Sequence, residues 1–175
     1  MSHLLIFKSR WGWMGLAGSE RGLAAIVLPR VSKSAVAADL GPQPGSSARL
    51  PSDLLLKARQ QLTEYLDGAR TSFDLPLDFS QGTAFQQRVW KTLRAIPYGE
   101  LWSYRGLASR IGGVQYARAV GGAVGANPLP IIVPCHRVIA QDETIGGFSS
   151  GLPAKRRLLA LEGSLSRLQP SRGQR

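Results

Sequence analysis

Two different sequence patterns meet near Ser80, in a chain whose 175 residues are enough for one good core or two small ones. Before it, short apolar runs at residues 4–7 and 24–28 are separated by glycines, which is typical of strands and turns. After it, capping residues precede apolar residues at helical spacing. We therefore predict an α+β fold, with a small N-terminal α/β domain at residues 1–80 and a mostly helical domain at residues 81–163.

The N-terminal domain should contain one long loop and one clear helix. Residues 41–51 are rich in glycine, proline and serine, which is typical of an exposed loop. Ser52 and Asp53 can cap a helix that carries several leucines and ends at Gly68. Residues 73–79 alternate between apolar and polar side chains, and this period predicts a short strand.

The C-terminal domain should begin with three helices in succession. Thr83 can cap the first of them. Ser103 can cap a second helix over residues 104–110, and residues 116–125 predict a third that is rich in alanine and glycine. Two adjacent glycines separate the second helix from the third, so this pair is predicted to form a helix-turn-helix.

A last helix and a basic tail complete the pattern. Pro153 suits the first turn of this helix, and Gly163 lies just past its end. Residues 164–175 carry three arginines and no acidic residue, together with proline and glycine. We expect this tail to be frayed and flexible.

The charge of the chain points to an anionic partner. Its 175 residues include 22 Lys and Arg against 11 Asp and Glu, a net charge of +11, and nucleic acid is the usual polymer that such a balance favours. A merely basic surface would have the same composition, so charge alone does not decide. No apolar run approaches the roughly 18 residues of a membrane helix. One cysteine and no export signal favour a reducing cytoplasm.

The only cysteine, Cys135, lies in a Pro-Cys-His-Arg sequence directly after an apolar run at residues 129–133. It cannot form an internal disulfide, so it either packs as a small apolar side chain or reacts. The neighbouring His136 is a base that can make a thiolate available. Structural zinc is not expected, because the remaining histidine, His3, is remote. These residues alone leave both interpretations of the cysteine open.

The helical half contains seven short motifs in a fixed order. They are Phe85-Gln86-Gln87-Arg88-Val89-Trp90, Ile96-Pro97-Tyr98-Gly99, Ser103-Tyr104, Ala117-Arg118-Ala119-Val120-Gly121, Asn127-Pro128, Pro134-Cys135-His136-Arg137-Val138-Ile139 and Leu158-Leu159-Ala160-Leu161-Glu162-Gly163. In this order they resemble the O6-alkylguanine-DNA alkyltransferases, also called methylated-DNA–protein-cysteine methyltransferases. The resemblance runs from about residue 83 to residue 163, and the cysteine motif preceded by Asn-Pro is its most specific part.

The resemblance implies a ribonuclease-H-like fold for the N-terminal domain and one reaction, direct-reversal DNA repair. An alkyl group such as methyl moves from O6 of guanine in duplex DNA to the Cys135 sulfur, after the damaged nucleotide has flipped out of the helix. The thioether product has no easy leaving group, so each molecule acts once. The reaction needs no metal or organic cofactor. The protein is expected to be a monomer and to have no membrane partner.

The resemblance gives five residues catalytic roles. Cys135 is the nucleophile, His136 is the base that acts through a bridging water, and Glu162 holds the histidine ring. Asn127 ties the recognition helix to the active-site loop. Tyr104 donates to the guanine ring as negative charge develops, or crowds the phosphate beside the lesion. Without the resemblance, Glu162 is an ordinary helix-end carboxylate, His136 a solvated or core histidine, and Tyr104 a half-buried aromatic.

Four further residues are placed around the flipped base by the resemblance. The carbonyl of Val138 reads the guanine amino group, and Phe148 and Ser149 lie in the loop that closes on the base. Lys155 lies near this loop, where a solvent-facing lysine at a helix start is the alternative. Two positions depart from the family, because Phe148 replaces the usual tyrosine and Ser150 replaces a glycine. Both departures bear on the range of alkyl groups that fit.

DNA contacts follow from the need to extrude a stacked nucleotide. Arg118 resembles the family arginine that fills the gap in the stack, and the small residues Ala117, Ala119 and Gly121 let the helix approach the minor groove. Minor-groove readout is degenerate, so binding should be largely independent of sequence. The basic residues expected to contact phosphates are Arg88, Lys91, Arg94, Arg105 and Arg110.

Two other function classes compete with repair. A cysteine hydrolase or acyltransferase would use Cys135, His136 and Glu162, but it leaves Arg118 and Tyr104 without a role. A lesion-sensing module would bind damaged DNA without transfer, and relatives of that kind replace the cysteine. Label transfer from alkylated DNA to protein separates the three classes.

Overall fold

The computed structural model describes residues 3–41 and 52–169. The chain divides into two compact units, Met1–Gln81 with Pro128–Pro130, and Gly82–Asn127 with Ile131–Arg175. The sequence places the boundary one residue earlier and does not indicate the excursion at Pro128–Pro130. In the first unit, the backbone N–H of Ile26 donates to the carbonyl of Pro128 at 2.9 Å.

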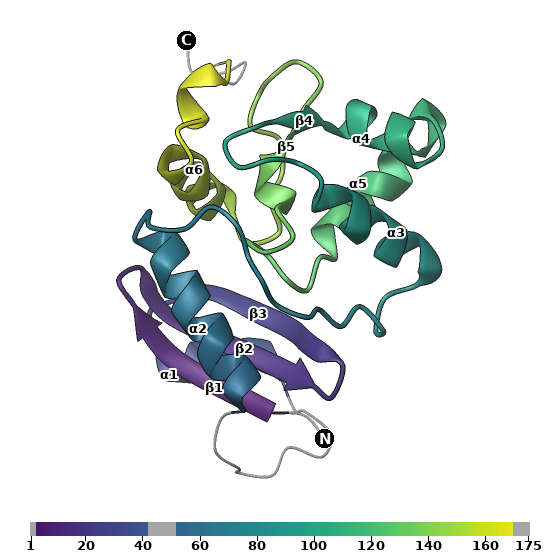
Figure 1. The fold of residues 1–175 in the computed structure, drawn as a ribbon. Coiled ribbons are helices and arrows are strands. Elements are labelled where there is room, and N and C mark those ends of the chain that lie inside the picture. The colour runs from purple at the N-terminus through teal and green to yellow at the C-terminus, as the bar shows by residue number, and fades with distance from the viewer. Residues whose placement is uncertain (1–2, 42–51, 170–175) are drawn as a thin grey trace. The chain divides into compact units, whose positions relative to one another are not determined.

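A three-stranded antiparallel sheet forms the centre of the first unit (Figure 1). Its strands are β1 (His3–Ser9), β2 (Gly12–Ser19) and β3 (Gly22–Arg30), in the order β1-β2-β3. The helices α1 (Lys33–Leu40) and α2 (Asp53–Leu66) cover opposite faces of it. A Cβ added at Gly15 would meet Val36 of α1, whereas one added at Gly18 would meet Leu55 of α2. Glycine at these two positions therefore lets each helix approach the sheet.

Two local features of this unit differ from the sequence prediction. Residues 73–79 form no regular strand, because only an isolated parallel bridge joins Leu77 to Leu23, and Pro76 has no N–H to extend the pairing. Helix α1 was not predicted, since only Val36 and Leu40 of it are buried. The predicted loop at residues 41–51 begins at Gly41, which ends α1 with φ 64°, and its other residues lie outside the described ranges.

The second unit is mostly helical, as predicted. Thr83 caps α3 (Ala84–Leu93) with a complete capping box, and Ser103 caps α4 (Tyr104–Ile111). Gly112 and Gly113 lead into a short 3-10 turn (Val114–Tyr116) and then α5 (Ala117–Gly125). The indole N–H of Trp90 donates to the carbonyl of Ala123 at 2.8 Å, which fastens α3 to α5. The predicted helix-turn-helix pattern is thus formed by α4 and α5.

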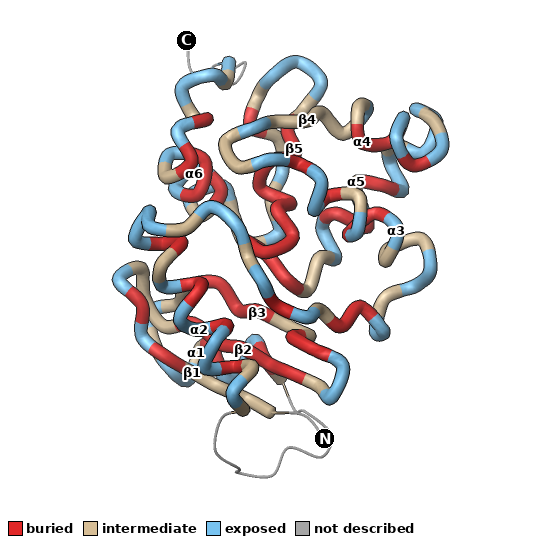
Figure 2. The backbone as a smooth tube through the Cα atoms, in the orientation of Figure 1, coloured by how far each residue is buried: buried red, intermediate tan, exposed pale blue. Residues whose placement is uncertain are grey.

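The rest of this unit surrounds a buried stretch of chain. Two short strands, β4 (Trp102–Ser103) and β5 (Val138–Ile139), pair in parallel. Residues 131–139 are all buried (Figure 2). Helix α6 (Leu152–Leu161) follows, with proline in its first turn and Gly163 at φ 73° past its end, as predicted. The cysteine motif therefore lies inside the helical unit.

The first part of the predicted tail is not frayed. Ser164 is fully buried, and a 3-10 turn (Leu165–Arg167) follows it. The Arg167 side chain donates to the carbonyl of Gly99, and its Nη1 lies 3.6 Å from a Glu100 carboxylate oxygen. Arg167 therefore donates a hydrogen bond to a backbone carbonyl within its own unit. The composition of the tail does not predict this contact. Residues 170–175 lie outside the described ranges.

Across residues 3–41 and 52–169, the helices are too short or too polar to cross a membrane.

Candidate active site

The Cys135 thiol is closed off from solvent at the start of a 3-10 turn (Cys135–Arg137). Its residue is 3% exposed. The side-chain amide of Asn127 donates to Cys135 Sγ at 3.0 Å and to the carbonyl of Val133 at 2.8 Å. One amide thus connects the end of α5 to the cysteine loop.

Burial raises the pKa of the Cys135 thiol. The hydrogen bond from Asn127, the positive charge of Lys155 and the backbone N–H groups of Cys135 and His136 act in the opposite direction. A raised pKa leaves the sulfur as a thiol near neutral pH, so a nearby base must take its proton before it can attack.

His136 and Glu162 form a buried pair beside the thiol. His136 Nε2 lies 2.9 Å from Glu162 Oε1, and both side chains are inaccessible to solvent. Burial lowers the pKa of His136, and it outweighs the raising effect of Glu162. Burial acts to raise the pKa of Glu162, but hydrogen bonds from His136 and Arg137 hold this pKa far below its usual range. Near neutral pH the site therefore holds a neutral imidazole against an ionised carboxylate.

Arg137 is a part of this site that the sequence analysis missed. Its Nε and Nη2 each donate to a different oxygen of Glu162 at 2.9 Å, and its Nη1 donates to the carbonyl of Ile96 at 2.6 Å. The backbone N–H of Gly99 adds a fourth contact to the same carboxylate at 3.2 Å. Glu162 is therefore not an ordinary helix-end carboxylate. The available signal was an arginine directly after the Cys-His pair, with an acid at a later helix end.

Lys155 points inward, contrary to the solvent-facing alternative. It is fully buried, and its Nζ donates to the carbonyls of Val138 and Ile145 at 2.6 Å each and of Gly147 at 3.1 Å. Three acceptors match the three N–H bonds of an ammonium group. Burial lowers the pKa of Lys155 to about 8, while Cys135 acts to raise it. The Val138 carbonyl accepts a hydrogen bond from Lys155, and its second lone pair can accept from another donor.

A pocket of about 210 Å³ lies next to these groups. It is lined by Tyr104, Gly121, Val124, Gly125, Gly147, Phe148 and Ser149. Four of the predicted site residues are thus brought together, whereas Ser150 is not part of the wall. Burial raises the pKa of the Tyr104 hydroxyl, and Cys135 adds to this effect. Tyr104 therefore remains a hydrogen-bond donor at neutral pH.

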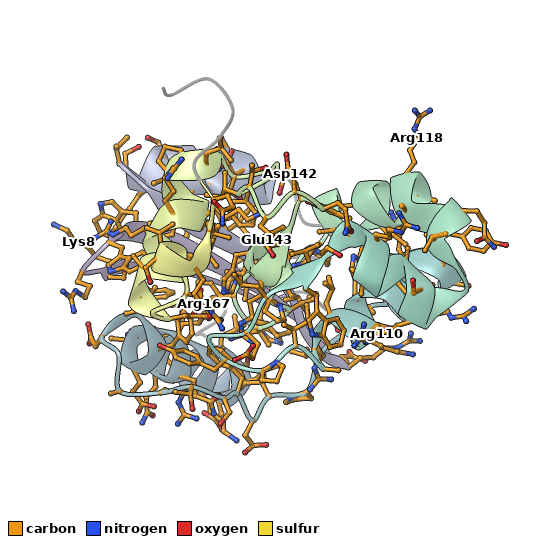
Figure 3. All side chains as sticks on the ribbon, turned by 90° about the horizontal axis from the view of Figure 1, so that it is seen from above. Lys8, Arg110, Arg118, Asp142, Glu143 and Arg167 are labelled. Atoms are coloured by element: carbon orange, nitrogen blue, oxygen red, sulfur yellow. The ribbon has the colours of Figure 1, made fainter. Side chains whose placement is uncertain are left out.

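The outer surface of α5 holds the predicted DNA contacts. Arg118 is exposed and projects away from the helices (Figure 3). Ala119 is exposed too, and Ala117 is partly exposed. Two of the five basic residues expected to meet phosphates have internal contacts, because Arg88 donates to the carbonyl of Ile111 and the Arg110 guanidinium lies 4.0 Å from the Trp102 ring centroid. Lys91, Arg94 and Arg105 are exposed.

Two family models match most of the chain. The one described as "6-O-methylguanine DNA methyltransferase, ribonuclease-like domain" matches residues 5–79, which confirms the predicted fold class of the N-terminal domain. The one described as "6-O-methylguanine DNA methyltransferase, DNA binding domain" matches residues 84–164.

Individual proteins agree with these models. A methylated-DNA–protein-cysteine methyltransferase of Haemophilus influenzae is 51% identical over 61% of the chain and 59% of its own length. One of Methanosarcina acetivorans is 40% identical over 91% of the chain and 97% of its own length. The crystal structure of Mycobacterium tuberculosis OGT in complex with DNA is 40% identical, with a TM-score of 0.76 over 93% of this chain and 94% of that one. The chain thus spans about three fifths of the Haemophilus relative.

Proposed function

The chain belongs to the 6-O-methylguanine DNA methyltransferase family, and on this basis we propose that it repairs O6-alkylguanine in duplex DNA by transferring the alkyl group to Cys135. The observation that carries the proposal is the closed arrangement of thiol, neutral imidazole and ionised carboxylate. Cys135 is 3% exposed, and the adjacent His136 lies 2.9 Å from Glu162. In such an arrangement the sulfur becomes a strong nucleophile only after a base has removed the thiol proton.

The transfer step balances without a co-reactant. His136 accepts the thiol proton, and the sulfur attacks the alkyl carbon in line with its bond to O6. A carbon–sulfur bond forms, the carbon–oxygen bond breaks, and the electron pair stays on the guanine. The guanine then takes up one proton, which replaces the proton that left the thiol, so no proton is gained or lost overall. His136 Nε2 faces Glu162, so the proton would move through Nδ1 and the bridging water that the family resemblance suggests. Ionised Glu162 stabilises the imidazolium that results.

The remaining site residues bind the base and the leaving group. The pocket lined by Tyr104, Phe148 and Ser149 would hold the extruded guanine, with the Tyr104 hydroxyl donating to the ring as charge develops. Lys155 would hold the Val138 carbonyl and the loop at Gly147 in place through its hydrogen bonds. These groups stabilise charge that appears during transfer.

DNA would be held along α5. Arg118 is exposed at its start and would fill the space that the extruded nucleotide leaves. The net charge of +11 favours binding to phosphates, so affinity should fall as salt rises. A thiol that must stay reduced also favours action in the cytoplasm.

The experiment is to incubate the protein with excess duplex that contains labelled O6-methylguanine and to measure intact mass. We expect one methyl per chain, located on Cys135, and restored guanine in the DNA. Turnover beyond one equivalent would indicate a hydrolase-like enzyme instead. Binding without a change of mass would indicate a lesion sensor. Cys135→Ser is the control, because it should bind the duplex and gain no mass.

Arg118→Ala should slow repair of duplex far more than reaction with free O6-benzylguanine. The free base has no stack to leave, whereas extrusion from duplex costs a few kcal/mol, so we expect a loss of roughly tenfold or more on duplex alone. Single-turnover rates on both substrates check this. Arg94→Ala, another exposed arginine of the same unit, is the matched control for lost charge. Equal losses on both substrates would contradict the role of Arg118.

A further inference from the structure

Two large apolar side chains are exposed in the turn between α4 and α5. Val114 is 44% exposed and Tyr116 is 46% exposed, and none of the three residues of this 3-10 turn is buried. Among the described residues of the second unit, the one further large apolar residue that is exposed is Leu152 on α6. Single exposed apolar side chains are ordinary. Here two lie within three residues, directly before α5 and the exposed Arg118.

Tyr116 precedes the first residue of α5, where a tyrosine does not stabilise the helix. Its side chain makes no capping hydrogen bond, whereas a serine or threonine caps each of α1, α2, α3 and α4. The ring instead lies against Gly112, where an added Cβ would be 3.4 Å from Cε2 and 3.5 Å from Cδ2 of Tyr116. One edge of the ring is thus supported by backbone, while nearly half of the residue is exposed. Neither capping nor burial explains this tyrosine.

The charge around the turn fits a polyanion. Residues 101–141 contain four arginines and no acidic residue. Two of these arginines, Arg105 on α4 and Arg118 on α5, are exposed. A surface that combines exposed apolar side chains with positive charge is complementary to nucleic acid, whose phosphates are anionic and whose bases and sugars offer apolar faces. Duplex DNA, the partner in the proposed function, is therefore the occupant that this turn fits.

We propose that Tyr116 and Val114 enter the minor groove of the duplex as an apolar wedge, beside the nucleotide that Arg118 replaces. The inference rests on the proposed function and adds a second contact with DNA to it. Proteins that bind the minor groove frequently insert apolar side chains between base steps and unstack them, and an aromatic ring can stack on a base. Unstacking on one flank lowers the remaining cost of extruding the nucleotide. The wedge therefore acts on duplex and has no effect on a free base.

The first test measures the Kd for duplex DNA by fluorescence anisotropy at several salt concentrations. Tyr116→Ala should weaken binding by about tenfold at each of them, which equals about 1.4 kcal/mol. The slope of log Kd against log salt should stay the same, because this slope reports the contacts between cations and phosphates. Loss of a cationic contact would instead reduce the slope by about one.

Three further variants control for the ring, the position and the fold. Tyr116→Phe keeps the apolar ring, so it should bind nearly as tightly as the wild type. Leu152→Ala removes an apolar side chain that is 42% exposed on α6, and it should leave the Kd unchanged. Val114→Ala should weaken binding by a smaller factor than Tyr116→Ala, and it tests the wedge independently if Tyr116→Ala does not fold. Urea unfolding of each variant checks the fold.

Single-turnover transfer to Cys135 gives the second readout. Tyr116→Ala should slow transfer from duplex O6-methylguanine by roughly tenfold at protein concentrations below the Kd, and it should leave transfer from free O6-benzylguanine unchanged. An unchanged Kd in both Tyr116→Ala and Val114→Ala would overturn the inference. So would a reduced salt slope in Tyr116→Ala, an equal loss of affinity in Tyr116→Phe, or an equal loss in Leu152→Ala. A wild type that binds duplex but transfers no methyl would overturn the proposed function, and the Kd values would still decide the wedge.

Discussion

Replacing Arg137 with methionine will lower the free energy of unfolding by about 3–5 kcal/mol, the range measured when one partner of a buried ion pair is removed. Arg137 makes two hydrogen bonds to Glu162 at 2.9 Å, and Glu162 is buried. Methionine keeps most of the apolar stem, so the loss reports the carboxylate left without its charge partner. Urea unfolding of the two proteins measures the difference.

An exposed ion pair supplies the matched control. Lys57 and Asp74 are as close, at 2.9 Å, but their side chains are 51% and 90% exposed. Lys57→Met should therefore cost much less stability than Arg137→Met. The double variant Arg137→Met with Glu162→Gln should recover part of the loss, because it removes the uncompensated charge. A loss at Arg137 no larger than that at Lys57 would contradict the predicted role of the buried pair.

The pH dependence of stability follows from the same residues. The pKa of Glu162 is lower in the folded protein than its ordinary value of 4.5. The ionised carboxylate therefore contributes fully to the free energy of unfolding above pH 4.5, and this contribution is lost as the pH falls through the folded pKa. His136 has a lowered pKa, so acidification below its ordinary value of 6.5 also favours the unfolded state, which binds the proton more readily. The difference between wild type and Arg137→Met should shrink at low pH, where Glu162 of the variant can become neutral.

The helices of the second unit could be predicted because their signals are local. Thr83, Ser103 and Pro153 act within one turn of the helix they begin, and the chain around them contains the whole of the interaction. The short strands β4 and β5 could not be predicted, because their pairing joins Trp102 to Val138. Such contacts depend on tertiary structure, which no local pattern of two residues encodes.

The chemistry of the site shows a similar division. Cys135 and His136 stand out in the sequence, but only the family resemblance distinguished a nucleophile from a buried structural cysteine. Arg137 was given no role, and only the resemblance placed Lys155 near the base loop, because long basic side chains are usually solvated. In the structure both are buried, and each satisfies partners from elsewhere in the chain. Whether a charged side chain is buried depends on the fold, so the sequence could not predict the burial of these two residues.

Lys155→Met should reduce transfer to Cys135 by roughly tenfold or more at pH 7, which corresponds to about 1.4 kcal/mol on the barrier. Two losses combine in this variant. The thiolate loses the positive charge that acts to lower the pKa of the Cys135 thiol, and three carbonyls around the pocket loop lose their donor. Lys155→Arg should restore the charge but not the geometry, because a planar guanidinium does not match three converging carbonyls.

Two readouts separate these losses. The pH profile of iodoacetamide labelling reports the thiol alone, and its midpoint should move to higher pH in Lys155→Met. The rate of transfer from free O6-benzylguanine reports thiol and pocket together. Because the pKa of Lys155 is about 8, its charge is present below that pH and lost above it, so the wild-type transfer rate should stop rising near pH 8 and the Lys155→Met rate should keep rising with thiol ionisation. An iodoacetamide midpoint that does not move, together with a wild-type profile that passes smoothly through pH 8, would show that Lys155 carries no charge that the thiol senses.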